Sequence, residues 1–81
     1  MVEDDFTYNR TWEQILHMLE KAEQKQNWHF MMIQRQDSNK GDKMTHMRNY
    51  KALEGVVNAL RWTLGDRQTS KEMVLGEKKN G

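Results

Sequence analysis

Two blocks of apolar residues, spaced by three and four positions, constrain the fold of this 81-residue chain more than any other feature. The first block begins after Thr11 and the second ends before Gly65. Apolar residues at this spacing lie on one face of an α-helix. The chain also lacks proline, the residue that most strongly interrupts helices. The sequence therefore predicts an all-α fold built on two long amphipathic helices.

The first predicted helix spans residues 11–36. Thr11 and Gln14 have the spacing of a capping box, in which each side chain accepts a hydrogen bond from the other residue's backbone N–H. Asn9 is a competing cap. Residues 23–27 are polar but contain no glycine, so we expect the helix to continue through the apolar residues 28–33. A short strand over residues 28–33 is an alternative that the sequence leaves open.

The second predicted helix spans about residues 44–64. The preceding residues 37–43 are polar and centred on Gly41, a composition typical of a tight connection. Gly65 follows at the position where a left-handed residue commonly ends a helix. Two long helices joined by a tight connection form an antiparallel hairpin.

The predicted hairpin domain covers residues 9–66. We expect the preceding residues 1–8 to be disordered, as chain ends commonly are. Residues 67–81 are predicted to be a tail containing at most a short helix, for which Thr69 and Glu72 have capping-box spacing. The last residues, 77–81, are predicted to be disordered.

A two-helix hairpin cannot cover both sides of its apolar seam, and this chain has no cysteine to form a disulfide. Pairing two hairpins into a four-helix bundle solves this problem with one contact. We therefore predict a homodimer. The positions assigned to the core or to the dimer contact are Trp12, Ile15, Leu16, Leu19, Phe30, Ile33, Leu53, Val56, Val57, Leu60 and Leu64.

The sequence predicts no enzyme, no cofactor and no metal site. None of the three histidines lies three or four residues from another, so no helix presents a paired-histidine site. Glu13, His17 and Glu20 share one helix stripe, but the second helix offers too few further ligands. Residues 37–42 resemble a calcium loop, yet Gly41 is at the fifth position instead of the sixth.

Seven methionines and three tryptophans in so short a chain favour a protein-binding surface. Between residues 35 and 51 the chain also carries a local excess of three positive charges, which makes nucleic acid binding an alternative. A structural or assembly component of a larger particle is a third alternative. The residues assigned to partner binding are Trp28, Met31, Met32, Arg35, Lys43, Met47, Arg48, Lys51 and Trp62.

No apolar run approaches the roughly 18 residues of a membrane-spanning helix. The formal net charge of +1 gives no strong field to attract a membrane surface. We therefore expect a cytoplasmic protein without a membrane partner.

The segment from Tyr50 to Asp66, which contains Trp62 and the Gly65 stop, resembles the last helix of small bacteriophage proteins, cyanophage proteins among them. The resemblance implies a compact accessory protein that binds and redirects or inhibits a host protein, which would place it in the host cytoplasm. It carries over no functional residues.

Overall fold

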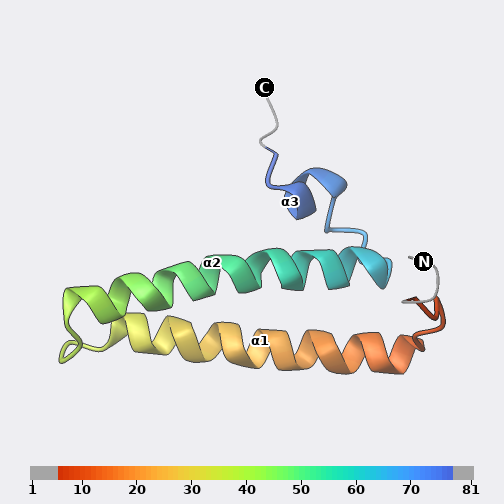
Figure 1. Ribbon diagram of the computed structural model, residues 1–81. Coiled ribbons are helices and arrows are strands. Elements are labelled where there is room, and N and C mark those ends of the chain that lie inside the picture. The colour runs from red at the N-terminus through yellow and green to blue at the C-terminus, as the bar shows by residue number, and fades with distance from the viewer. Residues whose placement is uncertain (1–5, 78–81) are drawn as a thin grey trace.

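The computed structural model describes residues 6–77, which form three helices and contain no strand. Helix α1 spans Trp12–Gln34, α2 spans Lys40–Thr63 and α3 spans Lys71–Leu75. α1 and α2 lie side by side and antiparallel, and α3 lies on the side of α2 away from α1 (Figure 1). The predicted all-α fold is confirmed, and residues 28–33 are helical, which excludes the strand alternative.

The start of α1 is the predicted capping box. The Thr11 hydroxyl accepts a hydrogen bond from the Gln14 backbone N–H at 3.1 Å, and the Gln14 amide oxygen accepts one from the Thr11 N–H at 2.9 Å. The helix ends at Gln34, two residues before the predicted end. Arg35 is extended, and its guanidinium donates two hydrogen bonds to Asp37 in the connection.

The prediction of a connection over residues 37–43 is wrong, because α2 begins at Lys40. Asn39 caps this helix, since its side chain accepts a hydrogen bond from the Asp42 N–H at 2.8 Å. Gly41 therefore lies in the first helical turn instead of at the centre of the connection. A cap residue outweighs the local preference of one glycine for a turn.

The end of α2 is a Schellman motif. Gly65 has a φ of +87°, and its N–H donates to the Trp62 carbonyl at 3.0 Å. The Asp66 N–H donates to the Arg61 carbonyl at 2.9 Å. The predicted role of Gly65 is confirmed.

The tail contains the short helix α3, which packs against α2 and makes no contact with α1 within residues 6–77. Its cap is Ser70, whose hydroxyl accepts from the Met73 N–H at 3.2 Å, so the expected cap at Thr69 is wrong. Thr69 is buried, and its hydroxyl donates to the Asp66 carboxylate at 3.0 Å.

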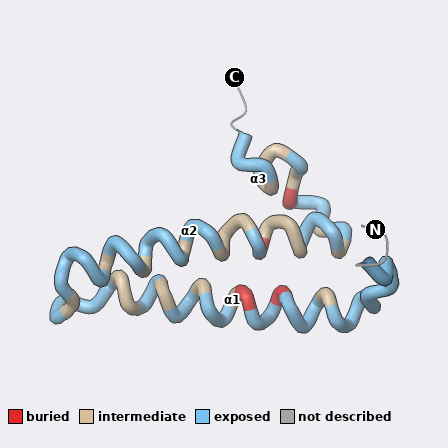
Figure 2. The backbone as a smooth tube through the Cα atoms, in the orientation of Figure 1, coloured by how far each residue is buried: buried red, intermediate tan, exposed pale blue. Residues whose placement is uncertain are grey.

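The core is very small. Among the described residues, the buried apolar side chains are Leu19, Ala22 and Val57, all in the half of the hairpin far from the connection (Figure 2). The radius of gyration is 15.7 Å. A compact domain of this length has about 12 Å. The fold is therefore elongated, and few of the described side chains are buried.

The positions predicted for the core or dimer contact divide into three groups. The chain itself buries Leu19 and Val57. The half-buried positions are Ile15, Ile33, Leu53, Leu60 and Leu64. The exposed positions are Trp12, Leu16, Phe30 and Val56. The prediction of disorder at residues 1–5 and 78–81 lies outside the described residues.

Candidate protein-interaction surface

The whole chain exposes more surface than a compact folded chain of its mass normally does. Its accessible surface is 7159 Å². A compact 9.7 kDa protein exposes about 5,100 Å². Fourteen large apolar side chains are exposed among the described residues.

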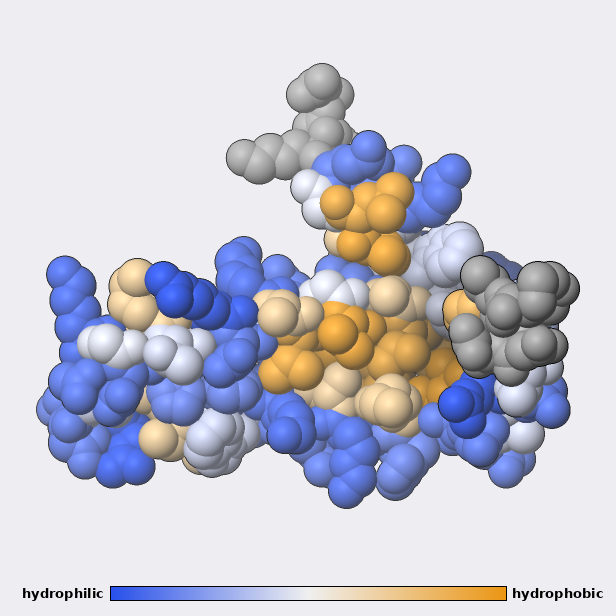
Figure 3. All heavy atoms as spheres, in the orientation of Figure 1, coloured by the Kyte–Doolittle hydropathy of each residue, from blue (hydrophilic) through white to orange (hydrophobic). Residues whose placement is uncertain are grey.

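We divide the hairpin into a base half, residues 12–23 and 52–63, and a tip half, residues 24–34 and 40–51. In the base half, the groove between the two helices carries an apolar area on the face shown in Figure 3. Ile15, Met18 and Leu60 line a hollow of about 430 Å³ together with Arg10 and Gln14. An apolar hollow with a polar border is the usual form of a protein contact site.

Within the base half, an ion pair joins the two long helices. Arg61 near the end of α2 donates to the Glu23 carboxylate of α1. This hydrogen bond, more than any other cause, raises the pKa of Arg61. The pair connects residues that lie 38 positions apart and therefore helps to set the register of the hairpin.

The tip half has a second hollow, of about 270 Å³. Phe30 and Ile33 of α1 line it with Met47, Tyr50 and Lys51 of α2. The rings of Phe30 and Tyr50 have their centroids 6.0 Å apart, a distance typical of interacting aromatic side chains. This hollow contains two of the exposed apolar residues, Phe30 and Met47.

A cluster of three rings, Trp28, His29 and His46, joins the helices in the tip half. The Nδ1 atoms of His29 and His46 are 2.8 Å apart, and the Trp28 ring packs edge-on against both imidazoles. Sequence reasoning missed this pair because it looked for histidines within one helix. The available signal was their similar distance from the connection: His29 lies five residues before the end of α1 and His46 six residues after the start of α2.

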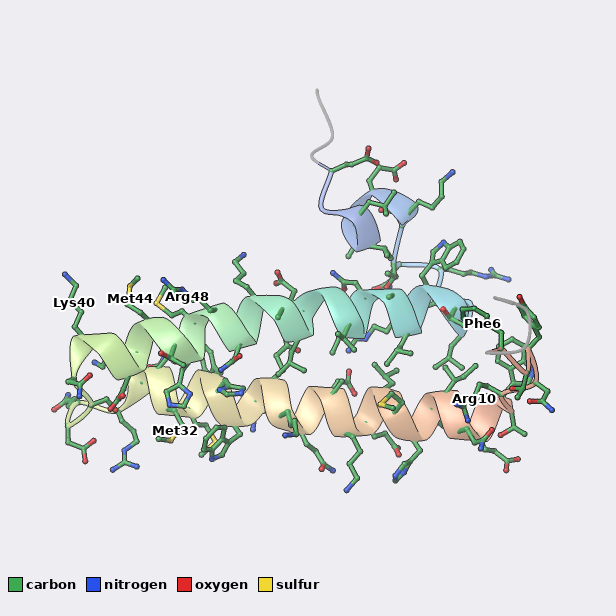
Figure 4. The ribbon with its side chains drawn as sticks, viewed as in Figure 1. Phe6, Arg10, Met32, Lys40, Met44 and Arg48 are labelled. Carbon is green, nitrogen blue, oxygen red and sulfur yellow. The ribbon has the colours of Figure 1, made fainter. Side chains whose placement is uncertain are left out.

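The predicted partner-binding residues do not form one continuous surface. Trp62 lies near the end of α2, in the base half, whereas the other eight lie in the tip half or at its connection. Trp28, Met31 and Met47 are each about half exposed, at 52%, 56% and 52%. Met32 lies on the outer side of α1 (Figure 4).

Two of the predicted basic residues are already neutralised by neighbours. Arg35 forms an ion pair with Asp37 at 2.7 Å, and this contact lowers the pKa of the carboxyl. Lys51 lies 3.6 Å from Glu54. Sequence counting over residues 35–51 could not include Glu54, which follows that segment by three positions.

A stripe of long side chains lies on the outer face of α2 in the tip half. Lys40, Met44 and Arg48 extend from the side of the helix that faces away from α1 (Figure 4). They follow one another at steps of four residues, so they form a single stripe. Lys43, the remaining basic residue of the predicted set, is half-buried.

Comparison of the chain with models of protein families, with curated proteins and with solved structures finds no significant match.

Within residues 6–77, no three histidine, cysteine or acidic side chains lie close enough together to hold a metal ion. None of the helices in this range combines the length and the apolar composition needed to cross a bilayer.

Proposed function

We propose that this protein is a non-catalytic protein-binding module that pairs with a second copy into a four-helix bundle. In this proposal the base half forms the dimer contact and the tip half binds another protein. The observation that carries the proposal is the ratio of core to surface: three buried apolar residues against fourteen large exposed ones in the described part of the chain. Such a surface is stabilised when a partner covers it.

The base half suits a second copy of the chain. The apolar part of its hollow, Ile15, Met18 and Leu60, comes from both long helices, as in the seam of a helical bundle. The exposed Leu16 and Trp12 lie within one turn of Ile15. A second hairpin laid on this face would cover positions that one hairpin leaves in water.

The tip half suits a different protein. Methionine side chains adapt to irregular partner surfaces, and tryptophan is favoured at the centre of protein contacts. Trp28, Met31 and Met47 supply both kinds of group. In the light of the resemblance of residues 50–66 to phage proteins, we propose a phage-encoded inhibitor or modulator that acts on a host protein in the host cytoplasm.

The dimer contact is tested with a matched pair of charge insertions on α1. Met18 lines the base hollow and is 57% exposed, whereas Gln24 is exposed on another face of the same helix. Met18→Glu is expected to convert the dimer to a monomer in size-exclusion chromatography with light scattering, because it places a charge in the apolar contact. Gln24→Glu is expected to leave the dimer intact. A monomeric wild-type protein at micromolar concentration would overturn this part of the proposal.

The protein partner is tested by affinity capture from a bacterial lysate with two tip variants. Met31→Glu places a charge among the exposed apolar side chains of the tip, and Gln36→Glu adds the same charge in the exposed connection. A protein captured by wild type and by Gln36→Glu, but lost with Met31→Glu and retained after nuclease treatment, supports the proposal. Capture that is equal for all three proteins contradicts it.

Nucleic acid binding is a second candidate, favoured by the stripe of Lys40 and Arg48 on the outer face of α2. Two cations on one exposed face can contact phosphates of a nucleic acid backbone. Lys40→Glu with Arg48→Glu would then abolish binding to a single-stranded or duplex probe, and the affinity would fall steeply with salt. Binding that does not respond to salt would exclude this candidate.

A further inference from the structure

The histidine pair of the tip half is a contact whose chemistry depends on pH. A hydrogen bond of 2.8 Å between two Nδ1 atoms requires one N–H donor and one free lone pair. At least one ring is therefore neutral. When both rings are neutral, one carries its proton on Nδ1 and the other on Nε2. When both rings are protonated, each Nδ1 is a donor and the bond cannot form.

The surroundings of the pair oppose a second positive charge. His46 on α2 and Lys25 on α1 are the charged groups that act on His29, and both are basic. Neither imidazole forms an ion pair with a carboxylate in the described part of the chain. Burial, His46 and Lys25, in that order, lower the pKa of His29 below its ordinary value of 6.5.

The pair also lies at the same height along the hairpin as the apolar hollow of the tip. Phe30 follows His29 directly, and Met47 follows His46 directly. Both of these neighbours line the hollow. Separation of the two imidazoles would therefore change the spacing of the helices where the hollow is formed.

We propose that His29 and His46 form a proton-sensitive latch that holds the tip half closed at neutral pH and opens it in mild acid. The hollow between Phe30 and Met47 changes with it, so the affinity of the tip for a partner depends on pH. This regulation goes beyond protein binding itself and does not require the second copy.

The sign follows from the two states of His29. The unfolded chain binds a proton at His29 near pH 6.5, whereas the closed hairpin binds it only at lower pH. The stabilising contribution of the pair is therefore complete above about pH 6.5 and is lost as the pH falls below that value. Two imidazolium groups at this distance repel each other, which separates the helices at the tip.

The experiment uses Trp28 as the reporter, because its ring contacts both imidazoles, with centroid distances of 4.8 Å and 5.3 Å. The two other tryptophans are replaced by phenylalanine (Trp12→Phe, Trp62→Phe), and emission and helix content are recorded between about pH 8 and pH 5. We expect Trp28 emission to titrate with a midpoint below 6.5 while the helix content stays nearly constant. Emission that stays flat over this range would overturn the proposal.

Three histidine variants in this background test whether the change in Trp28 emission comes from the His29–His46 pair. His29→Gln and His46→Gln are each expected to remove at least half of the emission change, whereas His17→Gln keeps it, because His17 is exposed on α1 and far from the connection. An emission change that persists in full in both tip variants contradicts the latch. If either variant unfolds, the imidazole proton resonances of His29 in the wild-type protein replace it: they must then shift over the same pH range as the Trp28 emission.

Discussion

The base half and the tip half are built from the same two helices but are closed by different chemistry. In the base half, Leu19, Ala22 and Val57 are buried and α3 packs on the outer side of α2. In the tip half no residue is buried, and rings close the gap between the helices. Aliphatic packing does not respond to pH, whereas a hydrogen bond between two imidazoles does.

The base half therefore stabilises the hairpin, whereas the contacts of the tip half depend on pH. The base half supplies most of the free energy of unfolding, because that energy scales with the apolar area removed from water. The tip half can therefore open without unfolding the whole chain. A segment with few buried contacts is also the segment that opens locally at low cost.

The largest effect is expected where the core is removed. Leu19→Ala should lower the free energy of unfolding by about 2 to 3 kcal/mol, because it deletes one of the few buried side chains and leaves a cavity. Ile33→Ala in the tip half should lower it by about 1 kcal/mol, since Ile33 is only half-buried. Urea unfolding followed by circular dichroism at one protein concentration measures both. Equal losses would remove the distinction between the halves.

A smaller effect is expected at the glycine that closes the base half. Gly65 has a φ of +87°, so Gly65→Ala should destabilise the protein by about 1 to 2 kcal/mol. Gly55 is the control: it lies inside α2, and a Cβ added there meets nothing within 4 Å. Gly55→Ala should raise the free energy of unfolding by about 0.5 to 1 kcal/mol through helix propensity. Thermal unfolding gives the sign of each change, and a shared sign would contradict the assignment of Gly65.

The N-terminal caps of the two long helices lie at opposite ends of the hairpin. Variants that remove one cap at a time therefore test whether both halves unfold together. Thr11→Ala removes the cap of α1 in the base half, and Asn39→Ala removes the cap of α2 at the tip. Each should lower the free energy of unfolding by about 1 kcal/mol. Hydrogen exchange should show that Asn39→Ala also accelerates opening at the tip alone. Acceleration that spreads through both halves would mean that the hairpin opens as one unit.

The sequence predicted the elements of this fold better than their contacts. Apolar spacing and the signals at Thr11 and Gly65 were sufficient for two helices, because these depend on neighbours in the chain. The predicted start of α2 at about residue 44 is wrong, because the cap at Asn39 begins the helix at Lys40 and Gly41 lies inside its first turn. Phe30 was placed on the seam correctly but is 45% exposed, because the helices of the tip half enclose no core.

The candidate site was less predictable than the fold. The exposed methionines and Trp28 were identified from composition and position, but the histidine pair depends on the register between two helices, which periodicity within one helix does not contain. The same limit applies to the ion pair between Glu23 and Arg61. Because the connection spans residues 35–39, His29 and His46 lie at similar distances along their helices from it.

The smallest effect is expected at the ion pair of the base half. The side chains of Arg61 and Glu23 are 44% and 38% exposed, so solvent screens their attraction. A double-mutant cycle with Glu23→Gln and Arg61→Gln should give a coupling free energy below about 1 kcal/mol, and added salt should reduce it further. This value is expected to be smaller than the loss in Leu19→Ala, because aliphatic burial and not charge holds the base half together. A coupling as large as that loss would mean that the two halves are alike in depending on polar contacts between the helices.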